Sequence, residues 1–498
     1  MRILFLIVLI SLIPSFYSQL VNSKHPIIII DTQGDDIMDE PKIESSMGII
    51  YNGPGVINNI NDSLNHYNGN IGIETRGNST QGFDKKTYSI ELRDMLNQDT
   101  SVNLLGMGKE EDWILHAMVI DKSQVRIPMS SYFFQRMGHY AYKWRYVELI
   151  INNEYRGLYI LTEKIKRDDD RVDISKLDDD DLLGDSVTGG YILRIDWLDN
   201  PIGFTSNYNS QAGIPMFFQW YYPKTINIKP QQASYIESWM ASFEEALYAP
   251  NYTNNQGVRY TEYIDFNSFT DFLLINELSK NADGYKLSSY VHKQKDSKGG
   301  RLVAGPIWDF DQTYGVSTVC SNQDPTGWTY MQNQFDCEDL ESMPMWWQTM
   351  MQDTVFKNHV KCRWSEFRQS FLHTDSIHDW IDSDTAFISE AIARNFNKWD
   401  YFIGAQIWIE PFPIPQSYAE EIEYMKNWIS NRVAWMDANI TGNCQYDVAG
   451  HSNLNNYSNP KKLLYVFDLL GRKSKIKSNV TLFYVYSDGS VEKKMIVE

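Results

Sequence analysis

The chain has 498 residues, a net charge of −19 at pH 7 and an aromatic content of 14%. The aromatic content excludes a disordered chain, and the length suits either one large catalytic domain or two to four smaller domains. The acidic balance argues against a nucleic-acid partner, because few positive charges are available to neutralise a phosphate backbone.

The N-terminus has the pattern of a secretory signal peptide. Arg2 supplies positive charge, and residues 3–13 form a nearly continuous apolar stretch. A stretch of about 11 residues is short for a bilayer-spanning helix, which needs about 20, so a membrane anchor is disfavoured. We predict a signal peptide over residues 1–18, with cleavage after either Ser18 or Ser23. The mature protein is then secreted, at the cell surface or along the secretory pathway.

Secretion changes how the cysteines and asparagines are interpreted. Four cysteines allow two disulfides in three pairings. We favour Cys320–Cys337, because this disulfide would close a short loop; Cys362 and Cys444 would then form the second pair. No Cys-x-x-Cys spacing occurs, which argues against a zinc site. Asn-x-Ser/Thr sequons become candidate glycosylation sites at Asn61, Asn78, Asn251, Asn439, Asn456 and Asn479.

The segment after the signal peptide predicts strands joined by turns. Residues 26–31 form an apolar run typical of a buried strand. Residues 71–76 and 87–92 alternate apolar side chains with small or polar ones, which predicts two more strands. Between these two lies a loop of small residues, 77–82. Such a loop either lets backbone N–H groups approach phosphates or is simply the turn of a hairpin.

Two lysines, Lys85 and Lys86, follow this loop and could supply positive charge to a phosphate. The strand pattern alone does not decide which lysine would do so. Asn78 lies inside the loop and belongs to a sequon, so a glycan there would hinder a nucleotide beneath the loop. Either the sequon is unused or the loop does not cover a ligand.

The middle of the chain mixes helices and strands. An amphipathic helix is predicted from Arg126 through Met137, and a hairpin over residues 145–161 turns at Asn152-Asn153. The aspartate-rich stretch 168–181 lacks the alternation and central glycine of an EF-hand, so a solvated loop is favoured over a calcium site. Further on, the pattern predicts a strand at 191–196, aromatic-rich turns at 217–222 and a helix at 234–247.

Two acidic positions bracket a predicted hairpin in residues 281–315. An apolar helix over 268–280 leads into Asp283, and a later strand ends at Asp309 and Asp311. A hairpin brings its two ends close together. In phosphoryl-transfer enzymes a first carboxylate orients a hydroxyl and a second, further along the chain, holds Mg²⁺. The alternative is that Asp283 forms a turn while Asp309 and Asp311 cap the loop that follows.

The remaining elements are predicted from their periodicity alone. Asp265 is a candidate N-cap for the helix over 268–280, and the hairpin strands fall at 290–293 and 302–308. Helices are predicted at 345–351, 356–372, 377–399 and 418–438, and short strands at 463–469, 479–486 and 491–497. The Asn/Ser-rich stretch before these last strands predicts a linker over 446–460 and a small β unit over 461–498.

Several of these segments, in the same order, resemble the CotH-type (spore-coat protein H) kinase family of secreted or surface proteins. The matching segments are Glu74–Ser79 with Lys85–Ile90, Asp112–Leu115 with Asp121 and Arg126, Gly157–Lys164, Gly190–Leu193, Asn281–Gly284 and Gly305–Asp311. The resemblance covers roughly residues 25–445. It implies an α+β, atypical protein-kinase-like, two-lobed fold, with an antiparallel β N-lobe and a mainly helical C-lobe. The C-terminal stretch Tyr465–Arg472 also looks like the sorting domains of some bacterial secreted proteins.

The resemblance also implies roles for individual residues. Asp283 matches the catalytic aspartate, and Asp309 matches the aspartate that holds the metal, with Asp311 as a second ligand. Ser288 stands five residues after Asp283, where kinase-like loops often place a metal-binding asparagine. On the nucleotide side, the implied contacts come from Arg76, Ser79, Lys86 in preference to Lys85, and Glu163, which either pairs with the lysine or lines the pocket.

The function implied is that of a secreted, Mg²⁺-dependent protein kinase. It would transfer the γ-phosphoryl group of ATP to Ser or Thr of extracellular, cell-surface or coat proteins. A rival hypothesis is a surface or coat adhesion protein that retains the fold without the chemistry, which Ser288 and the sequon at Asn78 favour. A third hypothesis, a carbohydrate-binding or carbohydrate-hydrolysing protein, depends on the aromatic residues and abundant carboxylates alone.

Overall fold

A computed structural model describes residues 20–77, 79–198, 201–334, 337–400, 402–444, 463–467, 474–475, 481–486 and 491–495. The predicted signal peptide and the predicted linker over 446–460 lie outside these residues, and so does Asn78. The described residues have a mixed α+β fold and divide into two compact units. Unit 1 draws on Met1–Val125, Tyr142–Lys164 and Asp379–Tyr424, and unit 2 on Arg126–Ala141, Ile165–His378 and Met425–Glu498.

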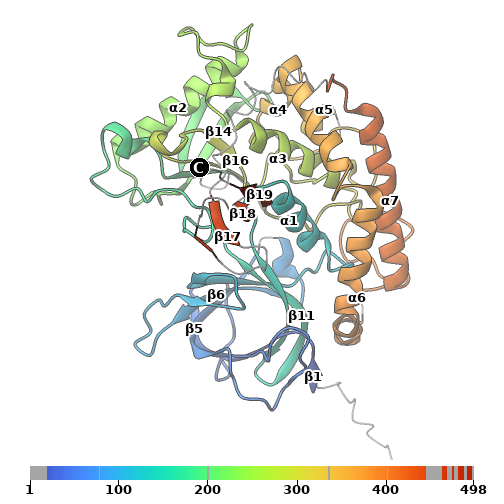
Figure 1. The fold of residues 1–498 in the computed structure, drawn as a ribbon. Helices are drawn as coiled ribbons and strands as arrows, with labels where there is room; N and C mark the ends of the chain where they lie inside the picture. Colours follow the sequence, from blue (N-terminus) through green and yellow to red (C-terminus); the bar gives the residue numbers. More distant parts are fainter. Residues whose placement is uncertain are drawn as a thin grey trace, which may run out of the picture. The chain divides into compact units, whose positions relative to one another are not determined.

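Unit 1 is built on a closed barrel with the strand order β10-β11-β9-β6-β5-β3-β2 (Figure 1). Neighbouring strands are antiparallel except β2 and β10, which pair in parallel. The sequence predicted an antiparallel sheet here; the closure and the parallel pair were not foreseen. The strands are β2 (Ile27–Asp31), β3 (Ile43–Ile50), β5 (Tyr67–Arg76), β6 (Thr87–Arg93), β9 (Asp112–His116), β10 (Trp144–Ile151) and β11 (Glu154–Glu163).

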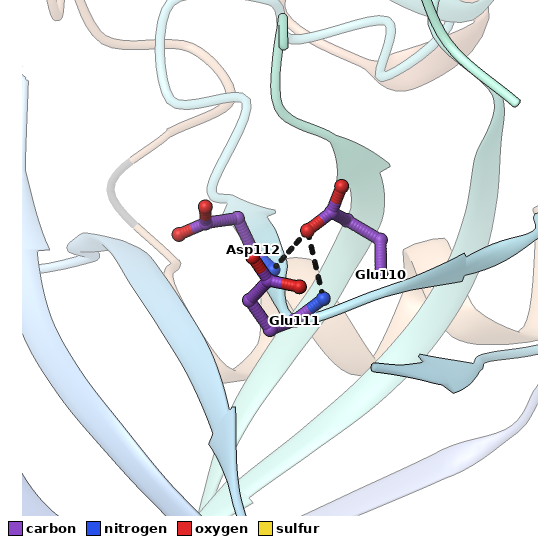
Figure 2. Close-up of side chains that lie close together, drawn as sticks. All are labelled: Glu110, Glu111 and Asp112. Atoms are coloured by element: carbon purple, nitrogen blue, oxygen red, sulfur yellow. Dashed lines mark hydrogen bonds between the residues drawn. The ribbon is translucent and has the colours of Figure 1, made fainter. Parts of the chain in front are cut away.

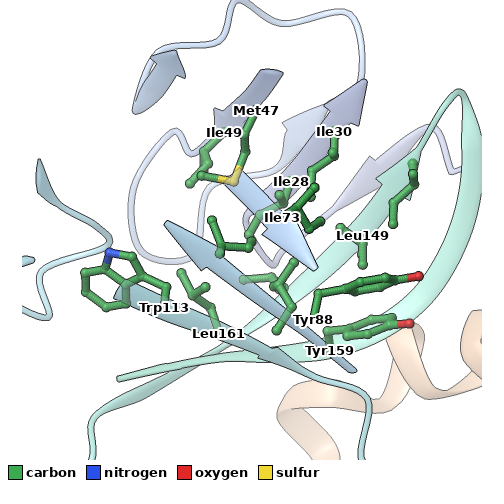
Figure 3. Packing of buried hydrophobic residues seen from close by; sticks show 14 of the residues in the cluster. Ile28, Ile30, Met47, Ile49, Ile73, Tyr88, Trp113, Leu149, Tyr159 and Leu161 are labelled. Carbon is green, nitrogen blue, oxygen red and sulfur yellow. The ribbon is translucent and has the colours of Figure 1, made fainter. Parts of the chain in front are cut away.

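Apolar side chains fill the barrel, as Figure 3 shows. Alternate residues of each strand point inward, so Ile28 and Ile30 of β2 meet Leu149 of β10 and Tyr88 of β6 in one cluster. Closure leaves no free strand edge, because β2 and β10 complete the ring. The barrel is therefore a packed core and not a pore.

The predicted hairpin between β10 and β11 is confirmed. Asn152 and Asn153 both have left-handed backbone angles, with φ of 51° and 63°, as a two-residue turn of this kind requires. Unit 1 also contains β1 (Asn22–Ser23), β4 (Asn58–Asn59), β7 (Val102–Asn103), β8 (Lys109–Glu110) and the short 3-10 helix η1 (Ser79–Gly82). Helices α6 (Thr374–Lys398) and α7 (Tyr418–Asn439) contribute residues to both units.

Unit 2 combines helices with a five-stranded antiparallel sheet in the order β13-β14-β12-β15-β16. The prediction of a mainly helical region missed part of this sheet. Residues 217–222, predicted as turns, belong to β14, because aromatic side chains pack well on a pleated surface. The strands are β12 (Tyr191–Ile195), β13 (Gly203–Asn209), β14 (Pro215–Tyr222), β15 (Ser289–Lys293) and β16 (Leu302–Ala304).

Helix α3 (Phe266–Ser279) is the centre of unit 2. Every residue of α3 except Asn267 is buried, and the carboxylate of Asp265 accepts the N–H of Ser268 at 2.8 Å, which confirms the predicted N-cap. The other helices are α1 (Arg126–Arg136), α2 (Pro230–Tyr248), α4 (Trp346–Met350) and α5 (Thr354–Arg368), with 3-10 helices η2 (Gly184–Thr188), η3 (Tyr260–Glu262), η4 (Asp296–Lys298), η5 (Val319–Ser321), η6 (Thr329–Gln334) and η7 (Leu340–Ser342).

A buried ion pair fixes the end of α3. The guanidinium of Arg432 donates to Glu277 at 3.0 Å, and both side chains are fully buried. Glu277 also accepts the backbone N–H groups of Thr329 and Tyr330 at 2.8 Å each. Removing one partner of such a pair costs about 3–5 kcal/mol, because the other charge stays buried without compensation.

The C-terminal strands were predicted and are present. They are β17 (Leu463–Phe467), β18 (Thr481–Tyr486) and β19 (Val491–Met495), and they pair antiparallel with Val466, Leu482 and Tyr484 as their buried cluster. Cys320–Cys337 is bonded, which confirms the preferred pairing, and Cys362–Cys444 is the second disulfide. Among the described residues, none of the helices combines the length and apolar character that crossing a membrane requires.

Candidate active site

The two acidic ends of the predicted hairpin lie together in unit 2. Strands β15 and β16 pair antiparallel, and β16 ends at Ala304, earlier than predicted, because Pro306 has no N–H to continue the ladder. The side-chain amide of Gln312 donates to the Asp283 carboxylate at 3.4 Å, and the N–H of Ala282 donates to the carbonyl of Gln312 at 3.4 Å. The chain before the hairpin is thus joined to the chain after it.

Asp283 sits in a tight turn at the end of α3. Lys280 ends the helix in the left-handed conformation, with φ of 45°, and the Asn281 side chain accepts the N–H of Asp283 at 3.1 Å. Gly284 is required at the next position, since a Cβ there would lie 2.7 Å from the side-chain oxygen of Asn276. The turn therefore fixes where the carboxylate of Asp283 emerges.

Asp309 and Ser288 face each other from the two sides of the hairpin. The hydroxyl of Ser288 donates to Oδ2 of Asp309 at 2.6 Å. Both residues have left-handed backbone angles, with φ of 46° at Ser288 and 54° at Asp309. Such angles are uncommon for residues other than glycine, and when they cluster they often mark functional sites. Ser288, predicted as a metal ligand, thus orients the carboxylate of Asp309.

Asp196 is a further member of this group that sequence reasoning missed. It follows the end of β12, and its Oδ1 accepts the backbone N–H of Ser288 at 3.4 Å. Ser288 therefore bridges two carboxylates, donating its N–H to Asp196 and its hydroxyl to Asp309. Arg194 pairs with the other side of Asp196 at 3.2 Å. The available signal was an acidic residue at the end of a predicted strand, the pattern that also singled out Asp309.

The carboxylate of Asp283 has an altered acidity. The pKa of Asp283 is raised to about 6, mainly by burial; the ammonium of Lys286 opposes this rise, and the charges of Asp309, Asp339 and Asp196 contribute to it. Like charges held close together disfavour ionisation of each. A carboxylate with this acidity can accept a proton near neutral pH, as a general base must.

The donor atoms of this group suit a divalent cation. Asp196, Asp283 and Asp309 offer carboxylate oxygens, which are the ligands that Mg²⁺ prefers. Among the described residues, the acidic group whose three ligand oxygens lie within 4.8 Å of one another is a different one, Glu110, Glu111 and Asp112. Asp311, the other predicted ligand, has Oδ1 accepting the N–H of Gln312 at 3.0 Å. Asp309 and Asp196 each accept a hydrogen bond from Ser288, which makes them the candidate pair for holding a cation.

The predicted nucleotide-binding residues lie in unit 1. Arg76 ends β5. Burial, with smaller contributions from the charges of Arg76 and Lys85, lowers the pKa of His116 to about 3. Lys85 is buried and donates to the carbonyl of Leu158 at 2.7 Å, which commits it to the barrel. Lys86 is only partly buried and donates to the carbonyl of Gln81 at 2.5 Å, so of the two lysines it is the more accessible.

Glu163 and Ser79 complete the nucleotide-binding prediction. Glu163 is buried at the end of β11 and pairs with Lys143, whose ammonium lies 3.5 Å from Oε1 and whose backbone N–H donates to Oε2 at 2.8 Å. Ser79 begins η1, and its side chain lies outside the described residues. The roles of these residues toward a nucleotide stay predictions.

A second acidic group lies in unit 1. Glu110, Glu111 and Asp112 each place an oxygen within 4.8 Å of the others (Figure 2). Glu110 accepts the N–H groups of Glu111 at 2.9 Å and of Asp112 at 3.5 Å, and Asp112 pairs with Lys164 at 3.6 Å. These contacts account for the arrangement as a local turn.

The sequence profile of the CotH kinase protein family matches residues 73–436, well over half of the chain. The chain belongs to the CotH kinase family. The matched range contains the hairpin with Asp283, Ser288 and Asp309, and also Asp196. The resemblance inferred from sequence segments is therefore confirmed. In the comparison with curated proteins, none matches this CotH-family chain.

Proposed function

We propose that this CotH-family protein is a secreted, Mg²⁺-dependent protein kinase that transfers the γ-phosphoryl group of ATP to Ser or Thr. The observation that carries the proposal is that Asp283 and Asp309 stand at the two ends of one hairpin, where Gln312 donates to Asp283 and Ser288 donates to Asp309. This is the order of residues that phosphoryl transfer uses: a base for the hydroxyl first, a metal-holding carboxylate second.

Asp283 would act on the acceptor hydroxyl. Its carboxylate accepts the hydroxyl proton as the new oxygen–phosphorus bond forms, and the bond from the γ-phosphorus to the bridging oxygen of ADP breaks. The pKa of about 6 suits this role, because the carboxylate is ionised at neutral pH and still basic enough to take a proton. Gln312 and the Gly284 turn hold the carboxylate in place.

Asp309 and Asp196 would hold the cation, and Ser288 would keep the Asp309 carboxylate turned toward it. A Mg²⁺ ion held by these two carboxylates would supply positive charge to the phosphate oxygens. Arg76, Ser79, Lys86 and Glu163 of unit 1 remain the candidates for contacts with the nucleotide. Among them Lys86 is preferred over Lys85, since Lys85 is committed to the Leu158 carbonyl inside the barrel.

Secretion is part of the proposal. Two disulfides are typical of proteins that mature in an oxidising compartment, which agrees with a signal peptide over residues 1–18. The substrates would then be extracellular, cell-surface or coat proteins that present Ser or Thr.

The proposal is tested with protein purified from a secreting host. The wild type is incubated with Mg²⁺, ATP and a casein-like protein, and phosphorylated residues on that protein and on the chain itself are identified by mass spectrometry. Transfer that disappears in Asp283→Asn, with unfolding temperature unchanged, supports the assignment. A wild type that transfers no phosphate, or a variant that transfers at the full rate, overturns it.

A second candidate is a surface or coat adhesion protein that retains the fold without the chemistry. Ser288 favours it, because a hydroxyl stands where kinase-like loops often have an amide ligand, and it is engaged with Asp309. Titration of Mn²⁺ by electron paramagnetic resonance separates the two. The kinase requires Mn²⁺ binding that Asp309→Asn weakens, whereas the adhesion protein predicts equal binding by both proteins.

A further inference from the structure

The loop that carries Asp283 is held by an irregular segment that the Cys320–Cys337 disulfide closes. The ammonium of Lys280, just before this loop, donates to the carbonyls of Ser321, Asp324 and Thr326, each at 2.7 Å. Three contacts use all three N–H donors of a lysine. The cation at the end of α3 is thus surrounded by the carbonyls of this one segment.

Lys286 makes a similar connection on the other side of Asp283. Its side chain is buried, and its ammonium donates to the carbonyl of Glu338 at 2.7 Å and lies 3.7 Å from Sγ of Cys320. Cys320 begins the closed segment, and Glu338 follows Cys337 directly. One lysine therefore touches the chain on both sides of the disulfide.

Lys286 also contacts Asp283 itself. Its backbone N–H donates to the carbonyl of Asp283 at 3.3 Å, and its charge opposes the burial that raises the pKa of that carboxylate. Burial lowers the pKa of Lys286, while the charges of Asp283 and Asp339 act in the opposite direction. The turn that carries Asp283 is thus hydrogen-bonded to the residue whose ammonium contacts the chain on both sides of the disulfide.

Two amide side chains complete the attachment. The side chain of Gln332 donates to the carbonyl of Ala282 at 3.1 Å, and that of Asn322 donates to the carbonyl of Lys280 at 2.5 Å. The closed segment has only the short 3-10 helices η5 and η6 among its described residues. Such irregular chain has few ladder hydrogen bonds of its own, so a covalent link has a large effect on its order.

We propose that the Cys320–Cys337 disulfide is a condition for activity, and that Lys286 is the positioning residue through which it acts on Asp283. This rests on the proposed function. Reduction by a dithiol breaks the S–S bond, and two electrons and two protons from the reductant yield two thiols. Cys320 and Glu338 are then free to separate, Lys286 loses its contacts on both sides, and the Asp283 loop loses its support.

The second disulfide provides a matched control. Cys362–Cys444 links α5 to the chain after α7, and Asn443 beside it donates to Asn358 of α5 at 2.8 Å. It closes a much longer stretch of chain, with a sequence separation of 82 against 17. Its loss should lower stability without disturbing residues 280–288.

The test compares Cys320→Ser/Cys337→Ser with Cys362→Ser/Cys444→Ser in the full chain. Phosphate transfer and hydrogen exchange of residues 280–288 are measured below both unfolding temperatures. The first pair should lower kcat at least tenfold and speed exchange in this loop, and the second pair should change neither more than twofold. Equal kcat and equal exchange in the first pair and the wild type would overturn the proposal.

Lys286 is tested separately. Lys286→Met should lower kcat and speed exchange in the loop, and Lys286→Arg, which keeps a cationic donor, should restore part of both. A Lys286→Met variant with the kcat and the loop exchange rate of the wild type would contradict the role of Lys286. Should the first cysteine pair fail to fold, graded reduction of the native protein, with the open disulfide identified by mass spectrometry, gives the same comparison.

The two proposals fail in different ways. Absence of phosphate transfer by the oxidised wild type refutes the kinase assignment, and with it the claim that the disulfide is a condition for activity. The exchange of residues 280–288 still decides whether the disulfide supports this loop, because that measurement needs no activity.

Discussion

Glu110, Glu111 and Asp112 in unit 1 can be compared with Asp196, Asp283 and Asp309 in unit 2. The first three are consecutive, and Glu110 accepts the backbone N–H groups of its two neighbours (Figure 2). Lys164 pairs with Asp112. The second three come from distant parts of the sequence, and the other two carboxylates raise the pKa of Asp283. Proximity of carboxylates therefore does not identify a site. Carboxylates that the fold brings together from distant parts of the sequence, against their electrostatic repulsion, are the better sign of function.

The largest effect on activity should come from replacing the carboxylate at either end of the hairpin, Asp283 or Asp309. Asp283→Asn removes the proton acceptor and Asp309→Asn removes a metal ligand, so each should reduce kcat by roughly 10²–10⁴-fold. Phosphate transfer to a casein-like protein measures this. The matched control is Glu110→Gln/Asp112→Asn, which should stay within twofold. A comparable loss in the control would mean that the barrel group is also functional.

Removing Asp196 should have the next largest effect. Asp196→Asn keeps the shape of the side chain but weakens its bond to a cation, so the Kd for Mn²⁺ should rise by roughly 10–100-fold. Titration followed by electron paramagnetic resonance measures the affinity without reference to activity. Asp112→Asn should leave the Kd unchanged. An unaltered Kd in Asp196→Asn would exclude this residue from the metal site.

The pH dependence of transfer should report Asp283. Its pKa of about 6 lies above the ordinary value of 3.8, so the native protein takes up this proton as the pH falls through about 6. The protonated acid cannot accept the hydroxyl proton, and kcat/KM should fall about tenfold per pH unit below that point. Asp196→Asn removes a charge that raises the pKa, so the inflection should move to lower pH.

Lys286→Met gives the opposite shift and so checks the sign. The ammonium lowers the pKa of Asp283, and its loss should move the inflection to higher pH. Profiles of kcat/KM between about pH 4.5 and pH 8 measure the inflection in both variants. Shifts in the same direction for both variants would show that another group titrates.

The smallest effects belong to the barrel group. Glu110→Gln weakens the acceptor of two backbone N–H groups, which should lower the free energy of unfolding by about 1 kcal/mol. Asp112→Asn removes a partly exposed ion pair with Lys164 and should cost less than about 1 kcal/mol. Urea denaturation measures both values. A loss of several kcal/mol would mean that this turn supports the barrel core.

The sequence by itself predicted most of the elements, because apolar periodicity and turn residues act locally. The β10–β11 hairpin, the N-cap at Asp265 and the Cys320–Cys337 pairing are confirmed. The family was also predictable, since its segments are short and contiguous. The roles of Asp283, Asp309, Asp311 and Ser288, and those of the unit 1 residues, stay predictions.

Only the tertiary structure decided how distant segments meet. The closure of β2 on β10 and the pairing of β14 with β12 join residues far apart in the sequence, and no local pattern encodes those partners. For the same reason Asp196 was missed: its link to Ser288 spans 92 positions. Long-range contacts depend on the packing of the whole chain, whereas helices, turns and caps depend on a few neighbouring residues.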